Sequence, residues 1–294
     1  MRETNERTLV SFDWAMKNIL RDKANFDILE GFLSTLLGEE IRVLSLLESE
    51  ANQEHELDKY NRVDLLAVDG SETIFVVEIQ YSWQPSYLKR LLYGTSKLVV
   101  ENVILGQSFD NVRKVISISI LYFLFGESQD DYLYYGKTAF YGMNSRKQLA
   151  VDMTKSPKER HVSPKSASDH TKAFNIFPEY YLIEVEHFQN VIQQPIDEWI
   201  YLFKNAQVKE DFRSKNIQSA KEKLTLLQMS EEERNAYENF LVGRANVFDM
   251  LEARYNQGKE EEKRENAGKM RMKGLESALI AEITGLSEAE ILAL

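Results

Sequence analysis

The chain has 294 residues, 43% of them hydrophobic, so it can bury a large core as one domain with appendages or as two smaller domains. It has no cysteine, which excludes disulfides, thiol catalysis and thiolate zinc sites and suits a reducing cytoplasm. Because the formal net charge is -11, binding to a phosphate backbone would need a local basic surface or a bound cation.

Neither the N-terminal segment nor the most apolar stretch is typical of a membrane protein. The first seven residues are charged or polar, so they do not form a signal peptide. Residues 115–125, the most apolar stretch, are too few and too rich in serine to span a bilayer. We therefore expect a cytoplasmic protein without a membrane partner.

The first third of the chain predicts helices followed by strands. Apolar residues recur at helical spacing over residues 11–37, with a break near 22–25 and a stop at Gly38. Residues 41–47 are typical of a strand. Residues 63–68 and 73–81 predict two more strands, and Asp69-Gly70 between them favours a hairpin turn.

The middle of the chain predicts one long helix and three strands. The helix covers residues 85–106, and the strands cover residues 114–125, 132–141 and 180–188. The first of these strands is a near-continuous run of β-branched and aromatic residues, which is typical of a central strand buried on both faces. Residues 156–169 predict a loop. The predicted helix has this apolar stripe: Leu88, Leu91, Leu92, Thr95, Leu98 and Val99.

Composition changes near Pro195, after which only helical periods remain. We therefore predict two domains, residues 1–194 and an all-helical extension over 195–294. The extension predicts helices at 196–203 and 231–273 and a short helical pair at 275–294, in which Ser287 and Glu290 form a capping box. We expect this last pair to serve packing or assembly as a homo-oligomer.

One segment is locally basic. Between Lys137 and Lys172 there are eight Lys or Arg residues and three acidic residues, a net charge of 8 - 3 = +5. It is either a solvated loop region or a surface that contacts phosphates. The nearby Tyr132, Tyr134 and Tyr135 could stack on bases, but their strand-like alternation is more typical of sheet residues.

Two carboxylates and an amide interrupt the predicted hairpin strands. Asp64 lies in one strand, and Glu78 and Gln80 lie near the end of the other, on one face of it. Charged groups in apolar strands must be paired or bound to a metal. A hard cation such as Mg²⁺ would relieve the repulsion between the carboxylates. Alternatively, Asp64 and Glu78 form a half-buried salt-bridge network with Arg62 or Arg90.

The residues of the predicted hairpin resemble a known family. Arg62-Val63-Asp64 followed by Val77-Glu78-Ile79-Gln80 is similar to the PD-(D/E)XK nuclease superfamily, and more closely to its recombination-promoting nuclease (Rpn), or transposase, branch. The resemblance covers nearly the whole chain and is most specific over residues 11–125. Five further segments carry it: 12–17, Arg90 with Tyr93, 116–120, 258–261 and 283–287.

This resemblance implies a restriction-endonuclease-like α/β fold, in which helices flank a mixed central sheet. It implies that Asp64 and Glu78 hold Mg²⁺ or another divalent cation such as Mn²⁺ or Ca²⁺. Gln80 stands where the superfamily commonly has a lysine; it can orient a water but supplies no positive charge. The missing cation is then Lys17.

Asp13 and Lys17 lie one helical turn apart and on one face. The resemblance implies that Asp13 assists the metal while Lys17 assists the phosphate or the water. The alternative is a local pair that stabilises only its own helix. Arg62 and Arg90 are candidate substrate-binding residues, and Arg90 could equally pair with Glu78.

The resemblance leads to one functional hypothesis and one alternative. The hypothesis is a metal-dependent DNA endonuclease that hydrolyses phosphodiesters, of the kind linked to DNA recombination. The alternative is an inactive nuclease fold that binds or assembles with partners, which Gln80 and the net charge of -11 favour. RNA as the substrate is also open.

Overall fold

The computed structural model describes residues 9–47, 65–101, 109–125, 131–149, 176–225 and 229–294. Within these ranges it does not describe the side chains of Asp13 and Lys17. The described chain forms two compact units, which divide between Gln228 and Met229.

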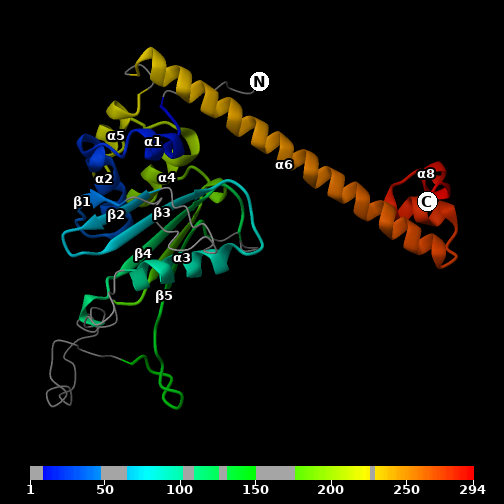
Figure 1. Ribbon diagram of the computed structural model, residues 1–294, viewed down its shortest axis with the longest axis horizontal. Helices are drawn as coiled ribbons and strands as arrows, with labels where there is room; N and C mark the ends of the chain where they lie inside the picture. Colours follow the sequence, from blue (N-terminus) through cyan, green and yellow to red (C-terminus); the bar gives the residue numbers. More distant parts are fainter. Residues whose placement is uncertain (1–8, 48–64, 102–108, 126–130, 150–175, 226–228) are drawn as a thin grey trace. The chain divides into compact units, whose positions relative to one another are not determined.

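The described strands of the first unit form one six-stranded mixed sheet in the order β1-β2-β3-β4-β6-β5 (Figure 1). Pairing is parallel between β3 and β4 and between β4 and β6, and antiparallel elsewhere. The strands are β1 (Val43–Leu46), β2 (Leu65–Asp69), β3 (Ile74–Gln80), β4 (Val115–Leu121), β5 (Leu133–Lys137) and β6 (Glu179–Glu184). The predicted central strand is β4, and every residue in it is buried.

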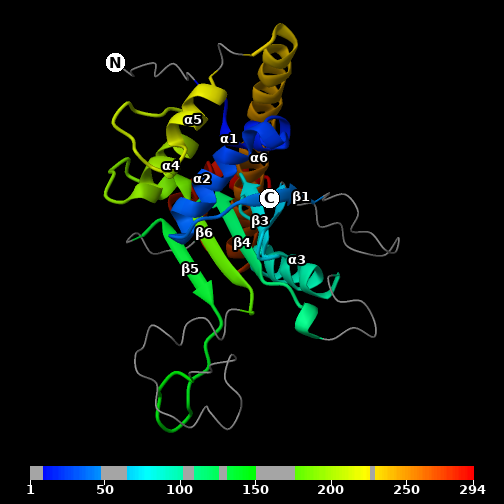
Figure 2. The ribbon, with the colours of Figure 1, turned by 90° about the vertical axis from the view of Figure 1, so that its left-hand side faces the viewer.

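Helices cover both faces of the sheet. Figures 1 and 2 show α3 (Tyr87–Glu101) on one face and α1 (Phe12–Asn18), α2 (Phe26–Leu37) and α4 (Pro195–Asn205) on the other. Leu98 of α3 packs against Val76 and other buried side chains of β2, β3 and β4. Because side chains alternate along a strand, Phe75, Val77 and Ile79 point away from α3.

The α1/α2/α4 layer is held together by aromatic packing. The ring centroids of Phe12 and Phe203 are 4.3 Å apart, and Phe32 packs edge-on against Phe203 at 5.0 Å. Helix α2 ends at Gly38, whose φ of 70° lies in the left-handed region that suits glycine. The described part of the unit also contains α5 (Ile217–Lys223) and the 3-10 turns η1 (Lys23–Asn25), η2 (Phe109–Asn111) and η5 (Val185–His187).

The second unit is helical, as predicted. It consists of α6 (Glu231–Met272), α7 (Ser277–Thr284) and α8 (Glu288–Leu292). Ser287 and Glu290 form the predicted capping box. A small core joins the end of α6 to α7 and α8: Ala267, Ile280, Leu286 and Ile291.

The structure bears on the apolar stripe predicted for α3 and on the boundary predicted at Pro195. The stripe predicted for α3 is wrong at Leu88 and Leu92, which are 53% and 60% exposed, because the face in contact with the sheet carries Tyr87, Leu91 and Leu98 instead. The boundary predicted at Pro195 stays a prediction from composition, whereas packing places α4 and α5 in the first unit. Among the described residues, no helix is both long and apolar enough to cross a membrane.

Candidate active site

The β2–β3 hairpin is shaped by Asp69, the first residue of the predicted turn. Its carboxylate accepts hydrogen bonds from the backbone N–H groups of Ser71 and Thr73, each at 2.9 Å. The residue with positive φ is Glu72, at 61°, and not Gly70. Asp69 N–H donates to the Thr73 carbonyl at 3.2 Å, so three residues connect the strands rather than the two of a tight Asp-Gly turn.

This turn sets the register of the hairpin. The last described pair of β2 and β3 is Leu65 with Val77. Residue alternation places Glu78 and Gln80 on the same face of β3 as Val76, which is the face covered by α3. Glu78 is buried, with 6% of its surface exposed, and Gln80 is half-buried at the end of the strand. A carboxylate so enclosed needs a partner or a cation.

The neighbouring strand β4 adds two hydroxyl groups to this face. Ser119 is the register partner of Glu78, and Ser117 is the partner of Val76. Both serines are almost fully buried, and neither hydroxyl has a hydrogen-bond partner among the described residues. Sequence reasoning assigned no role to either. The signal was the alternation of serine with isoleucine in a buried strand, which predicts a polar face.

Arg90 of α3 flanks the same region. Its Nη1 donates to Gln84 Oε1 at 3.2 Å, and its guanidinium carbon lies 5.3 Å from the ring centroid of Tyr87. Its buried Nη2 has no hydrogen-bond partner within the described part of the chain. Thr95, about 140° away around the helix axis, contacts the Tyr180 hydroxyl of β6 at 3.0 Å. Arg90 therefore lies on a different side of α3 from the contact with β6.

Several predicted site residues cannot be placed. Arg62 and Asp64 lie outside the described residues, as do the side chains of Asp13 and Lys17, although their backbone belongs to α1. The described residues contain no group of three or more His, Asp or Glu side chains placed to hold a metal. Of the predicted constellation, the structure places Glu78 and Gln80 on one face of β3 and Arg90 on α3, the helix that covers this face.

Nevertheless, the donor chemistry around Glu78 fits a hard cation. The buried Glu78 carboxylate offers oxygen ligands, and the Ser119 hydroxyl in the adjacent register position has no partner in the described residues. Oxygen ligands of this type are those that Mg²⁺ and Ca²⁺ prefer. A buried polar atom without a partner is also a place where an ordered water or ion is expected.

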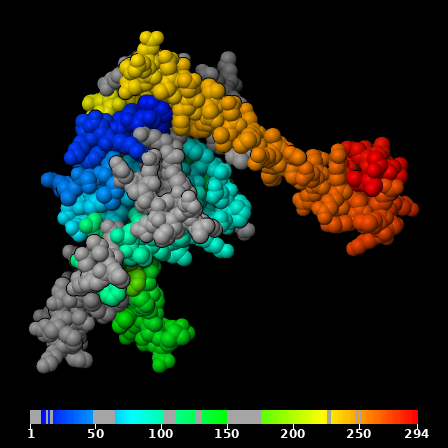
Figure 3. Space-filling view, viewed as in Figure 1, coloured from blue at the N-terminus to red at the C-terminus, as the bar shows by residue number. Residues whose placement is uncertain are grey.

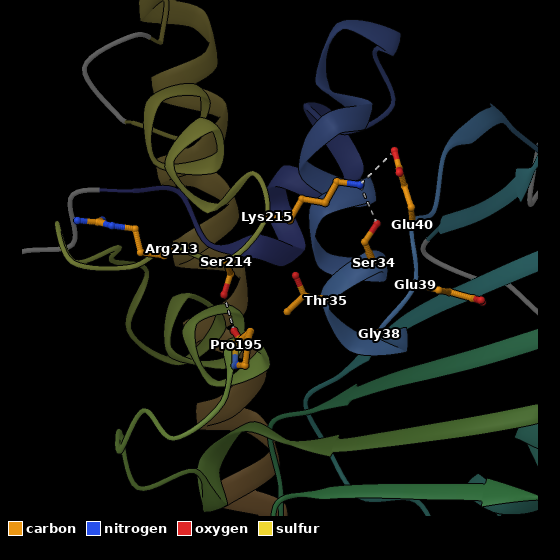
Figure 4. Close-up of a pocket in the computed structure, with 9 residues that line it drawn as sticks. All are labelled: Ser34, Thr35, Gly38, Glu39, Glu40, Pro195, Arg213, Ser214 and Lys215. Atoms are coloured by element: carbon orange, nitrogen blue, oxygen red, sulfur yellow. Dashed lines mark hydrogen bonds and ion pairs between the residues drawn. The ribbon is translucent and has the colours of Figure 1, made fainter. Parts of the chain in front are cut away.

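A separate pocket lies elsewhere in the first unit (Figure 4). It has a volume of about 610 Å³ and is lined by the end of α2, Pro195 and the segment before α5. Lys215 Nζ lies 3.2 Å from Ser34 Oγ and 3.9 Å from Glu40 Oε1, so its charge is already engaged. None of the predicted site residues lines this pocket, and it is not the candidate active site.

Comparison with known proteins agrees with the fold. Residues 10–154 match the model of the PD-(D/E)XK nuclease family transposases. This span contains β1 to β4, α3 and every predicted site residue. No curated protein and no solved structure matches the chain. Residues 10–154 of this chain are a domain of the PD-(D/E)XK nuclease family transposases.

Proposed function

We propose that the chain is a divalent-metal-dependent DNA endonuclease with its active site at the open end of the β2–β3 hairpin. The observation that carries the proposal is the register of that hairpin. Leu65 pairs with Val77, so continuation of the antiparallel pairing by one residue would make Glu78 the partner of Asp64. Directly paired residues share a face of the sheet, which would put both carboxylates on the α3 side.

In this proposal Asp64 and Glu78 are the metal ligands, with Asp13 as a third candidate, and the ion is Mg²⁺, Mn²⁺ or Ca²⁺. A bound divalent cation would polarise a phosphoryl oxygen and lower the pKa of a bound water. The Gln80 side chain, on the same strand face as Glu78, can accept or donate a hydrogen bond and thus orient a water.

The positive charge that Gln80 lacks must come from other side chains. Lys17 of α1 is the proposed source of charge beside the water or phosphate. Arg90 and Arg62 are the proposed contacts to the phosphate of the substrate, and the buried Nη2 of Arg90 supports this role because a guanidinium N–H in such a place needs an acceptor.

The test is metal-dependent nicking of supercoiled plasmid DNA by Asp64→Ala and Glu78→Gln variants. Loss of a metal ligand should lower the rate by more than the roughly 10- to 100-fold typical of an outer-shell partner. The matched control is Glu72→Gln, which removes a carboxylate from the turn of the same hairpin. Equal nicking by the wild type and both site variants would contradict the proposal.

The second candidate function is a nuclease fold that binds DNA or assembles without cleaving. Gln80 and the net charge of -11 favour it. A protein with this function would cleave DNA only at the background rate in Mg²⁺, Mn²⁺ and Ca²⁺, and it would still bind DNA or a protein. Assembly as a homo-oligomer through the C-terminal helices stays a prediction, which sedimentation equilibrium of the full chain would test.

A further inference from the structure

A short hairpin follows β5, the edge strand of the sheet. Residues 138–149, here called the arm, turn back on themselves through a bridge between Tyr141 and Gln148. Gly142 N–H donates to the Lys147 carbonyl at 2.9 Å, and Leu149 N–H donates to the Phe140 carbonyl at 2.6 Å. Figures 1 and 3 show this green segment extending from the end of β5 away from the sheet.

The charge of the arm differs from that of the rest of the protein. Lys137 at its base and Arg146 and Lys147 on its return strand are basic, and no residue from Lys137 to Leu149 is acidic. This local charge of +3 occurs in a chain whose net charge is -11. All three cations are exposed, and none of them is in an ion pair within the described part of the chain. Such a surface attracts phosphates.

The arm also exposes large apolar side chains. Tyr141 is 59% exposed and Met143 is 80% exposed. Tyr132, just before β5, differs: it donates a hydrogen bond to Asp197, and burial together with that carboxylate raises the pKa of Tyr132. Tyr135 of β5 is 48% exposed but packs against Tyr181, so Tyr141 is the more accessible of the two.

The sheet register gives the distance between Glu78 and the base of the arm. Glu78, Ser119, Leu182 and Tyr134 are successive register partners across β3, β4, β6 and β5. Three strand spacings and three residues along β5 put Lys137 about 17 Å from Glu78. Because β5 runs antiparallel to β6, the arm leaves β5 at the end of the sheet opposite to Gln80, so it is a separate surface from the one around Glu78.

We propose that the arm is a contact for the DNA backbone, separate from the residues around Glu78. This inference rests on the proposed function only in taking DNA as the substrate. Arg146, Lys147 and Lys137 contact phosphates, and Tyr141 packs against sugar or base where strands are open.

The experiment measures binding of the full chain to a labelled 30-base-pair duplex and the matching single strand at several salt concentrations. EDTA is present, so no phosphodiester is broken and the proposed metal site does not contribute. The Arg146→Ala/Lys147→Ala variant should lower the slope of log K against log salt by about 1.8 on the duplex, from two lost phosphate contacts. The matched control, Arg21→Ala/Lys23→Ala, removes two exposed cations from elsewhere in the unit.

A companion pair tests the aromatic contact. Tyr141→Ala should weaken single-strand binding about 5-fold or more, and Tyr141→Phe should not. Equal salt slopes for the arm variant and the control variant would overturn the proposal. A variant that keeps the wild-type slope but changes its oligomeric state would also overturn it. If duplex binding depends on the arm but the protein does not cleave DNA under any condition, the arm proposal holds and the proposed endonuclease function is wrong.

Discussion

At the scale of single residues, Ser119 and Ser117 offer a matched comparison. They lie on the same strand and face, are equally buried, and have hydroxyls without a described partner. Only Ser119 is the register partner of Glu78. We infer that the Ser119 hydroxyl holds a water or ion beside Glu78, whereas Ser117 belongs to the packing under α3.

We therefore expect Ser119→Ala to reduce both Mn²⁺ affinity and cleavage by roughly 10- to 100-fold, as loss of an outer-shell hydrogen bond typically does. Ser117→Ala should change either quantity less than about 2-fold. Ser119→Thr keeps the hydroxyl and should retain most of the activity. Mn²⁺ binding by electron paramagnetic resonance separates this role from a loss of stability. The same loss in both alanine variants would refute it.

At the scale of elements, the β2–β3 turn determines the register on which the site depends. Asp69→Ala would remove the acceptor of two backbone hydrogen bonds, and we expect it to lower the free energy of unfolding by about 1–3 kcal/mol. Asp69→Asn keeps an acceptor and should cost less. Urea denaturation measures both. A fully stable Asp69→Ala variant would mean that the strands, and not the turn, determine the register.

The elements were predictable wherever periodicity or turn chemistry acts locally. The break before α2, the stop at Gly38 and the apolar strand β4 all follow from such signals. The exposed face of α3 was not predictable, because Leu88 and Leu92 fit a helical stripe as well as Leu91 does. Contact with the sheet decides which stripe is buried, and that contact is a tertiary property.

The candidate site was predictable only in part, for a similar reason. Glu78 and Gln80 are visible as polar residues in an apolar strand. Ser119 is distant from them in sequence, and only the parallel pairing of β3 with β4 brings it beside Glu78. The roles of Asp64, Lys17 and Asp13 stay predictions.

At the scale of the whole molecule, packing predicts how far the chain can be shortened. A chain ending at Gln228 keeps the hydrogen bond from Val10 N–H to the Leu224 carbonyl and all of the aromatic layer. A chain ending at residue 194 loses Trp199 and Phe203. Truncating such residues to alanine typically costs about 3–5 kcal/mol each, which is comparable with the whole stability of a domain, about 5–15 kcal/mol.

We therefore expect residues 1–228 to unfold cooperatively and residues 1–194 not to fold. Circular dichroism during thermal unfolding distinguishes them. A cooperative transition for residues 1–194 would instead support the domain boundary that composition predicts.

The central claim is that a divalent cation binds between Asp64 and Glu78. The most direct measurement is anomalous difference density from a crystal soaked in Mn²⁺. We predict a peak bounded by the carboxylate oxygens of Asp64 and Glu78. A map without that peak, in which Glu78 is ion-paired with Arg62 or Arg90, would contradict the account and favour the salt-bridge network.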